Sequence, residues 1–259
     1  LADPAPVAQT FFVDDDVKEF CTLDGIITLV DAKHVVQHLD DEKPEGAENE
    51  AVEQVAFADG KIKDFDAIIA TGSDNSARYF DYYFGKYPHI IRKNRSSAAV
   101  IHGNESEEEL KKLGEDIFRY FGLGCRNVSK AYIPQDFEVD RLFNAFYDYS
   151  YVGDNNKYGN NYDYNRAIYL MEKKDFLENG FFIIREKQDL HAPVAVLHIE
   201  RYSDLTKVES DLQAQEEKLQ CVVSQKPLSR ETVPMGETQK PQLWDYADNV
   251  DTLEFLNTL

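Results

Sequence analysis

The chain has 259 residues, of which 42% are hydrophobic, and its formal net charge at pH 7 is −20. This hydrophobic content is ordinary for a globular protein, so a disordered chain is not favoured. The strong negative charge argues against nucleic acid and against an anionic membrane surface as partners.

The three cysteines are scattered along the chain, at Cys21, Cys125 and Cys221. An odd number without a C-x-x-C spacing indicates neither a disulfide framework nor a cysteine zinc site, and no metal is expected. No apolar run approaches the roughly 20 residues of a membrane span, and no signal peptide is recognisable. The cytoplasm is therefore the simplest expected location.

Residues 1–59 carry 15 acidic and 3 basic side chains, and this imbalance hints that the chain joins two segments of different origin. Residues 25–32 form a nearly continuous apolar run, which predicts a buried strand of a parallel sheet. A short helix is expected over 33–39. It would bring His34 and His38 to one face, but two histidines without a third ligand favour a solvent-exposed pair over a metal site.

Several stretches of this first segment are similar to the middle of a CobW-type GTPase, namely residues 1–4, 23–34 and 49–59. Members of that family are P-loop proteins that hydrolyse GTP and help to deliver metal ions. The resemblance implies a partial P-loop GTPase-like βα segment over residues 1–59. The sequence contains neither the G-x-x-x-x-G-K-[ST] motif that cradles phosphate nor an N-K-x-D guanine motif, so a nucleotide would have no anchor.

The resemblance changes near Gly60, where we expect a junction between residues 1–59 and a second part, residues 60–259. No Pro-rich or Ser-rich linker separates the two parts, which is unusual for domains that fold independently. The chain therefore resembles a fusion of two partial domains.

A strand, a glycine turn and a helix are predicted early in the second part. The strand covers residues 67–70, the turn is Thr71-Gly72-Ser73, and the helix runs over 74–84. A strand followed by a glycine turn and a helix N-terminus is a natural site for an anion or a ribose.

An amphipathic helix is predicted further along the chain. Ser106 and Glu109 form an S-x-x-E capping box, which marks its start. Apolar residues then recur at spacings of three and four, at Leu110, Leu113, Ile117 and Phe121. This spacing predicts one buried face that extends to Phe121.

Cys125 follows this helix directly. Gly122 and Gly124 release the chain from the helix, and a strand is predicted over 129–134. A cysteine in such a turn can reach solvent and lie near backbone N–H donors, which lower the pKa of a thiol and make it a nucleophile. The alternative is a small, buried and inert cysteine.

The rest of the chain reads as further alternating elements. Helices are predicted over 137–146, 166–177 and 204–219, and strands over 181–184, 194–199 and 221–224. Residues 147–164 are rich in tyrosine and polar residues and predict a long loop, which either lines a substrate entrance or, as we prefer, makes a surface or oligomer contact. Cys221 lies inside a predicted strand and is expected to serve packing.

Three motifs occur in the order found in the aldehyde dehydrogenase superfamily. Residues 69–73 (I-A-T-G-S) resemble its F-T-G-S turn beside the nicotinamide, and residues 121–125 (F-G-L-G-C) resemble its cysteine motif. Residues 189–194 (D-L-H-A-P-V) stand where the superfamily has E-x-F-G-P-V. The three motifs are most similar to those of the LuxC-like acyl-CoA reductases, and residues 243–248 also resemble the tail of those enzymes. The resemblance spans residues 61–259.

This resemblance implies an α/β fold, an open and mainly parallel sheet with helices on both faces. It also implies that Cys125 attacks an acyl-CoA thioester and forms an acyl-enzyme, with Gly124, the Cys125 N–H and Asn127 near the developing oxyanion. His191 replaces a glycine of the motif and is expected either to transfer a proton or to serve structure.

The resemblance further implies NADPH or NADH as the hydride donor, with contacts from Thr71, Gly72 and Ser73. Asp189 stands where the superfamily's glutamate holds the nicotinamide ribose. The general-base glutamate of aldehyde-oxidising relatives has no counterpart, because residues 89–96 contain no carboxylate. Loss of that base fits reduction of a thioester, which must avoid hydrolysis.

Three cations near this position, Arg92, Lys93 and Arg95, are either solvated charges or contacts to a phosphate of coenzyme A or the dinucleotide. Most of the superfamily's dinucleotide-binding domain precedes the T-G-S turn, where this chain resembles a GTPase instead. We therefore expect weak cofactor binding and slow turnover from the chain alone, and a homo-oligomer is compatible with the sequence. The alternatives are a GTP-dependent metal-delivery protein and a non-catalytic interaction protein.

Overall fold

A computed structural model describes residues 65–72 and 74–259 of the chain. The chain divides into two compact units, one that ends at Lys93 and one that spans Asn94–Thr258. The junction expected near Gly60 and the elements expected within residues 1–59 lie outside the described residues.

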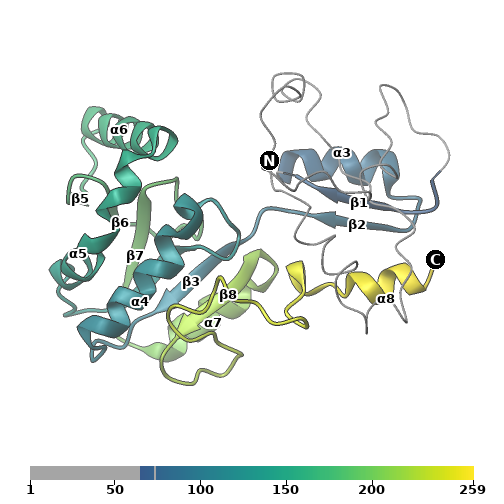
Figure 1. The fold of residues 1–259 in the computed structure, drawn as a ribbon. Helices are drawn as coiled ribbons and strands as arrows, with labels where there is room; N and C mark the ends of the chain where they lie inside the picture. Colours follow the sequence, from purple (N-terminus) through teal and green to yellow (C-terminus); the bar gives the residue numbers. More distant parts are fainter. Residues whose placement is uncertain (1–64, 73) are drawn as a thin grey trace, which may run out of the picture. The chain divides into compact units, whose positions relative to one another are not determined.

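The first unit contains a β–α–β arrangement among its described residues. Strand β1 (Ile68–Thr71) is followed by helix α3 (Asp74–Phe84) and strand β2 (His89–Arg92) (Figure 1). The two strands pair in parallel, with Ile68 opposite His89 and Thr71 opposite Arg92. Parallel neighbours require a crossover connection, and α3 supplies it. The predicted strand and helix are confirmed.

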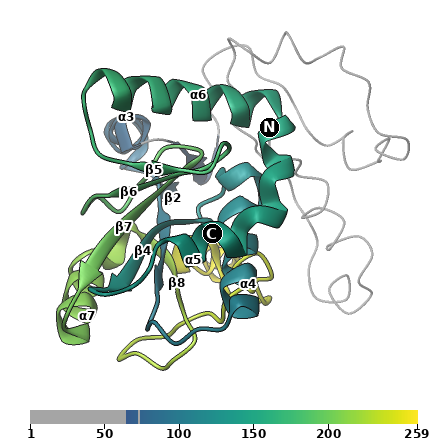
Figure 2. The same cartoon turned by 90° about the vertical axis from the view of Figure 1, so that its left-hand side faces the viewer.

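The second unit is built on a six-stranded sheet with the order β5–β6–β7–β4–β3–β8 (Figures 1 and 2). Its strands are β3 (Ser96–Val100), β4 (Val128–Pro134), β5 (Leu177–Glu178), β6 (Ile183–Glu186), β7 (Val196–Tyr202) and β8 (Leu219–Ser224). All neighbours pair in parallel except β5 and β6. The expected α/β class with an open, mainly parallel sheet is confirmed for the described residues.

Helices cover both faces of this sheet. They are α4 (Glu107–Phe118), α5 (Asp140–Phe146), α6 (Asn156–Met171) and α7 (Leu205–Ala214), and α8 (Thr252–Asn257) follows near the end of the chain. Strand β3 shows how the two faces divide, because successive side chains of a strand point to opposite sides. Ala99 packs in the cluster with α4, α5 and α6, whereas Ala98 and Val100 pack in the cluster with α7.

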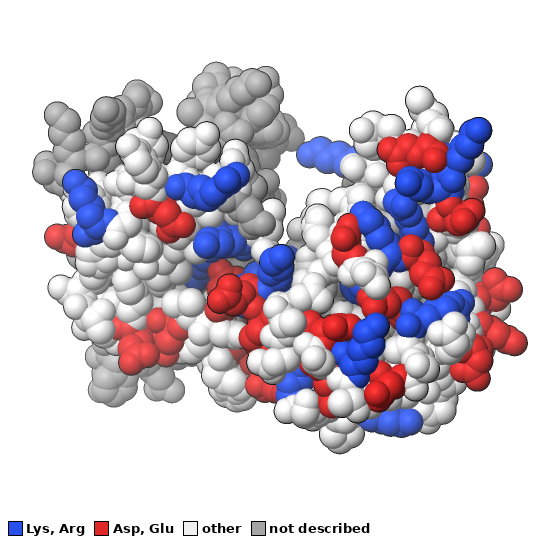
Figure 3. Space-filling model, turned by 180° about the vertical axis from the view of Figure 1, so that it is seen from behind, with Lys and Arg blue, Asp and Glu red and all other residues white. Residues whose placement is uncertain are grey.

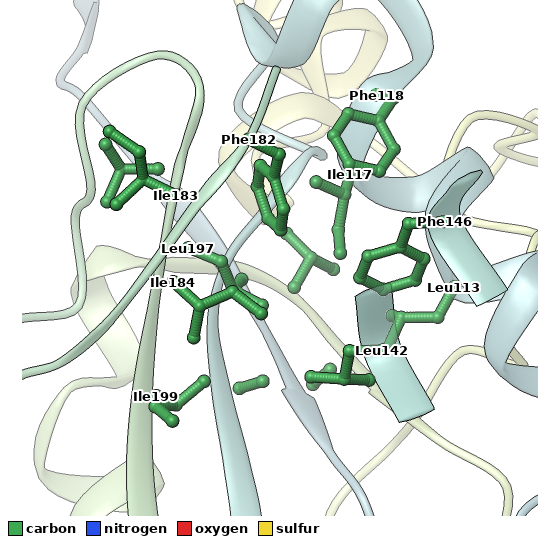
Figure 4. Packing of buried hydrophobic residues seen from close by; sticks show 14 of the residues in the cluster. Leu113, Ile117, Phe118, Leu142, Phe146, Phe182, Ile183, Ile184, Leu197 and Ile199 are labelled. Carbon is green, nitrogen blue, oxygen red and sulfur yellow. The ribbon is translucent and has the colours of Figure 1, made fainter. Parts of the chain in front are cut away.

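Aromatic rings fix the end of α4 to the rest of the unit (Figure 4). Phe118 is buried and meets Phe146 and Phe182 edge to face, with ring centroids 5.5 and 4.9 Å apart. Such pairs contribute about 0.5–1.5 kcal/mol each beyond their burial. The turn that carries Cys125 follows directly, so this cluster anchors it.

Residues 147–164, expected as a loop, are helical instead. The 3-10 helix η4 (Tyr147–Asp154) leads into α6, and the N-cap Asn155 accepts hydrogen bonds from two backbone N–H groups of the first turn. The buried residues of α6 are Tyr158, Tyr162, Asn165 and Tyr169. They recur every three or four positions, so they form the core-facing side of a helix. The helix expected over 166–177 is only the second half of α6.

The helix expected over 204–219 is also shorter than the pattern predicted. It ends at Ala214, and the 3-10 turn η5 (Glu216–Lys218) connects it to β8. Cys221 is buried in β8, which confirms the packing role.

The surface of the described residues carries charges of both signs. Figure 3 shows lysine and arginine interspersed with aspartate and glutamate over the face in view, without a large patch of one sign. Within the described part of the chain, no helix combines the length and the apolar character that a membrane crossing needs.

Candidate active site

Helix α4 starts as predicted and ends sooner. The capping box at Ser106 and Glu109 forms with both reciprocal hydrogen bonds. The helix stops at Phe118, three residues before the apolar spacing predicted, because Tyr120 and Phe121 adopt positive φ angles of 53° and 59°. The left-handed conformation costs a non-glycine residue about 1–2 kcal/mol. The turn before the cysteine is therefore strained.

Asn127 holds this turn in place through its side-chain amide. Its Oδ1 accepts a hydrogen bond from Gly124 N at 2.8 Å. Its Nδ2 donates to carbonyl oxygens at the end of α4, those of Asp116, Ile117 and Arg119, at 3.1, 3.3 and 2.9 Å. The last carbonyl oxygens of a helix have no hydrogen-bond donor within the helix. The buried amide of Asn127 provides that donor here. Both amide hydrogens are thus engaged with main-chain oxygens, which makes Asn127 a positioning residue rather than a free donor to an oxyanion.

Cys125 is exposed, as expected for a cysteine in a glycine turn. Its carbonyl oxygen accepts a hydrogen bond from Ser97 Oγ at 2.9 Å. The same hydroxyl accepts a hydrogen bond from Cys221 N at 3.1 Å. These bonds fix Cys125 at the edge of the sheet where β3, β4 and β8 begin.

The surroundings of the sulfur do not favour the thiolate. Partial enclosure by protein raises the pKa of the Cys125 thiol, and the negative charge of Asp248 adds to the effect. The positive charge of Arg126 and the backbone N–H groups of Cys125 and Arg126 act in the opposite direction. The expectation of a lowered pKa is wrong for this structure, first because the surrounding protein partly encloses the thiol and second because the C-terminal segment contributes a carboxylate.

Two carboxylates of that C-terminal segment pair with arginines at this edge. Asp248 Oδ1 lies 3.2 Å from Arg95 Nε, and the two side chains are only 13% and 17% exposed. Asp245 Oδ2 lies 3.9 Å from Arg126 Nη2. Arg95 also donates to Leu219 O at 3.0 Å, so it is neither a solvated charge nor free for a phosphate. Sequence reasoning gave the two aspartates no role, since pairing between distant segments leaves no local signal.

The loop between β6 and β7 carries the two other predicted residues of this unit. His191 is exposed, and its Nδ1 lies 3.1 Å from Ser96 Oγ at the start of β3. Asp189 is exposed and pairs with Lys187, which lowers the pKa of its carboxyl. The structure thus attaches His191 and Cys125 to neighbouring residues of β3, and no hydrogen bond joins their side chains among the described contacts.

The predicted cofactor turn lies in the first unit, and Ser73 falls outside the described residues. Thr71 ends β1, and Gly72 N donates to Arg92 O at 3.1 Å. A Cβ added at Gly72 would come within 2.8 Å of Ser76 Cβ, so the turn requires a glycine. The strand, glycine turn and helix fit the form that binds an anion or a ribose in dinucleotide sites.

A cavity of about 470 Å³ lies at the opposite end of α4 from Cys125. Its lining residues are Glu107, Leu110, Arg141, Asn144 and Tyr147. No predicted site residue is among them. Within residues 65–72 and 74–259, no group of three or more His, Cys, Asp or Glu side chains is placed to hold a metal ion.

Comparison with known proteins finds a family that the N-terminal residues of the chain resemble. Residues 1–63 match the family model of the CobW/HypB/UreG nucleotide-binding domain. Zinc-regulated GTPase metalloprotein activator 1 of Schizosaccharomyces pombe is 46% identical over 46 residues, which are 18% of this chain and 11% of that protein. Its Saccharomyces cerevisiae namesake is 44% identical over 41 residues, 16% and 10% of the two chains. The chain spans about a tenth of these relatives, and the expected similarity to CobW-type GTPases is confirmed.

Solved structures with partial similarity include aldehyde dehydrogenases. KauB of Pseudomonas aeruginosa has a TM-score of 0.48 and 12% identity over 63% of this chain and 41% of its own. AldA, the indole-3-acetaldehyde dehydrogenase of P. syringae, has a TM-score of 0.46 and 10% identity, with coverages of 61% and 39%. The Mycobacterium tuberculosis aldehyde dehydrogenase has a TM-score of 0.43 and 14% identity, with coverages of 56% and 38%. The LuxC-like branch stays a prediction.

Proposed function

We propose that this chain reduces an acyl-CoA thioester to an aldehyde through an acyl-enzyme on Cys125. The placement of Cys125 supports this most: the residue is exposed and fixed in a strained turn by Asn127 and Ser97. Backbone strain around an exposed nucleophile is typical of functional sites. The motif that contains the cysteine resembles the nucleophile motif of the aldehyde dehydrogenase superfamily.

The proposed reaction has two stages. First, the Cys125 sulfur bonds to the thioester carbonyl carbon, the bond from that carbon to coenzyme A breaks, and coenzyme A leaves with the proton that Cys125 gives up. Second, a hydride reaches the same carbon, the bond to Cys125 breaks, the aldehyde leaves, and the cysteine regains a proton. A nicotinamide dinucleotide, NADPH or NADH, supplies this hydride when bound.

Main-chain groups of the turn are the best candidates to stabilise the developing oxyanion. The N–H groups of Cys125 and Arg126 already face the sulfur, whereas Gly124 N is bound to Asn127 Oδ1. His191, held by Ser96, is the candidate that gives or takes a proton.

Each unit, taken by itself, contains residues that resemble dinucleotide-binding positions of the superfamily. In the first unit, Thr71, Gly72 and Ser73 would contact a dinucleotide, and the glycine lets the backbone approach a ligand closely. In the second unit, Asp189 would accept hydrogen bonds from the ribose hydroxyls, and its ion pair with Lys187 would then break.

Reduction is favoured over oxidation because the position of the general-base glutamate in aldehyde-oxidising relatives carries no carboxylate in this chain. Residues 89–96 contain no carboxylate, and the carboxylate of Asp248 is paired with Arg95. An acyl-enzyme that resists hydrolysis persists long enough to receive a hydride.

The first stage needs no dinucleotide, so it can be tested even if turnover is slow. The full chain is mixed with a long-chain acyl-CoA, and peptide mass spectrometry measures acylation while a thiol reagent measures released coenzyme A. We expect a thioester on Cys125 that the Cys125→Ser variant loses and the Cys221→Ser variant keeps. No adduct on Cys125, or equal adducts on both cysteines, would contradict the proposal and favour a non-catalytic interaction protein.

The match of residues 1–63 to a nucleotide-binding domain supports a second candidate, a GTP-dependent metal-delivery protein. The sequence lacks the phosphate-binding motif that this function requires. Calorimetric titration of the full chain with GTP tests this second candidate. Tight binding of GTP would favour the metal-delivery protein over the acyl-CoA reductase.

A further inference from the structure

The part of the chain that joins β6 to β7 crosses the sheet without a helix. The two strands are parallel neighbours, so the chain must return from the carboxyl end of β6 to the amino end of β7. Residues 187–195, here called the crossover segment, make this return without forming a helix or a strand. The main-chain carbonyl groups of such a segment need hydrogen-bond donors from elsewhere in the protein.

Lys130 binds the first part of the crossover segment. Its side chain is fully buried on β4, and its Nζ donates to Lys187 O at 3.3 Å and to Gln188 O at 2.6 Å. The third partner of Nζ is Glu200 Oε2 on β7, at 2.5 Å. An ammonium group has three hydrogens, so all of them are used, and two of them bind the crossover segment. The buried ammonium group therefore fixes this backbone to β4.

The next two carbonyl groups of the crossover segment are bound as well. His198 on β7 has its Nδ1 3.0 Å from Asp189 O. Ser129 on β4 donates its hydroxyl to Leu190 O at 2.9 Å. Four consecutive carbonyl groups, those of residues 187–190, are thus held by side chains of two adjacent strands.

The residue that follows these four carbonyl groups is His191. The carbonyl bound by Ser129 belongs to the peptide bond that joins Leu190 to His191. Leu190 is buried, whereas His191 is exposed and has its ring Nδ1 3.1 Å from Ser96 Oγ. The backbone before the imidazole and the imidazole itself are therefore both held, and the ring is presented at the amino edge of the sheet.

We propose that Lys130 and Ser129 are positioning residues for His191, because they fix the crossover segment that presents the imidazole. This inference rests on the proposed function, in which His191 gives or takes a proton. An acid or base acts only within hydrogen-bond reach of the group that it serves, and a displacement of about 1 Å can slow a reaction roughly 100-fold. Lys130 thereby influences the rate of acyl transfer through the backbone.

Two pairs of variants separate the anchors from their surroundings. Lys130→Met/Glu200→Gln is compared with Glu200→Gln alone, so both chains lack the charge of Glu200 and only one lacks the ammonium group. Ser129→Ala removes a single hydrogen bond and decides the question if the Lys130 variant fails to fold. Its matched control is Ser203→Ala, at an exposed position of the same unit.

The first measurement is cleavage of the native full chain by endoproteinase Lys-C, followed by peptide mass spectrometry. A protease cuts a segment only when it opens, so cleavage after Lys187 reports release of the crossover segment. Cleavage after the exposed Lys207, inside α7, reports unfolding of the whole unit. In Ser129→Ala we expect about fivefold faster cleavage after Lys187, the factor that one lost hydrogen bond gives, and a larger increase without Lys130. Equal increases at Lys187 and Lys207 would show a loss of stability alone and overturn the inference.

The second measurement is the rate at which a long-chain acyl-CoA releases coenzyme A. We expect Lys130→Met/Glu200→Gln to be at least about tenfold slower than Glu200→Gln, and Ser129→Ala to be slower than Ser203→Ala. In a His191→Gln background both differences should disappear, which a purely structural role would not produce. Equal rates within each pair, or differences that persist without His191, overturn the inference and leave the proposed function intact. No release from the unaltered chain would instead overturn the proposed function, and the positioning role with it.

Discussion

Replacement of Asn127 by alanine should lower the unfolding free energy of the second unit by more than the loss of one amide side chain usually does. Asn127 has two amide hydrogens and one acceptor oxygen, and all three are used in hydrogen bonds with Gly124 and the end of α4. Each such bond contributes about 1 kcal/mol net, so the variant should lose about 3 kcal/mol of unfolding free energy. For a unit of this size, that loss corresponds to a fall in Tm of about 6–12 °C.

Urea and thermal unfolding followed by circular dichroism measure this loss. Asn161→Ala is the control, because Asn161 is exposed and makes a hydrogen bond to Lys157 O, so its removal should change stability by less than about 0.5 kcal/mol. Asn127→Asp should be worse than alanine, since it turns carboxylate oxygens toward the negative end of α4. A loss below about 1 kcal/mol for Asn127→Ala would refute the positioning role.

Two further predictions concern buried ionisable groups. Burial lowers the pKa of His198 to about 4, below its ordinary value near 6.5, so stability should be complete above pH 6.5 and fall by up to about 3 kcal/mol toward pH 4. His198→Asn, which can still donate to Asp189 O, should remove this dependence in urea titrations at several pH values. Lys130 is fully buried, with Nζ 2.5 Å from Glu200 Oε2, so Lys130→Met should cost about 3–5 kcal/mol. Exposed Lys207→Met should cost almost nothing, and equal effects of these two variants would contradict the ion-pair argument.

Local signals predicted the elements whose formation depends on neighbours in the sequence. The capping box at Ser106 and the strand that ends at Thr71 appear in the structure as expected. Each depends on a side chain or a backbone position within a few residues. The exposure of Cys125 followed from its place in a glycine turn for the same reason.

The failures share a different physical cause. Residues 147–164 have low helix propensity, and burial of Tyr158 and Tyr162 against the core outweighs it. The pKa of the Cys125 thiol is raised by burial and, to a smaller extent, by Asp248, and both effects come from tertiary packing of distant segments. The side chain of Asn127 could serve an oxyanion or a helix end, and only its hydrogen-bond partners decide between the two.

The position of the candidate site is unusual for an open α/β sheet. Ligands in such folds generally bind outside the carboxyl ends of the strands, and the cavity lined by Glu107 and Arg141 lies beside the helix that follows the carboxyl end of β3. Cys125, Ser97 and Arg95 lie instead where strands begin. The cavity lining contains no cysteine, whereas the amino edge combines an exposed thiol, backbone N–H groups that face it, and a carboxylate that affects its protonation. Covalent chemistry requires an accessible nucleophile, and the exposed thiol meets that requirement although the carboxylate does not favour its ionisation. The presence of a nucleophile, rather than the size of the cavity, therefore favours the amino edge as the candidate site.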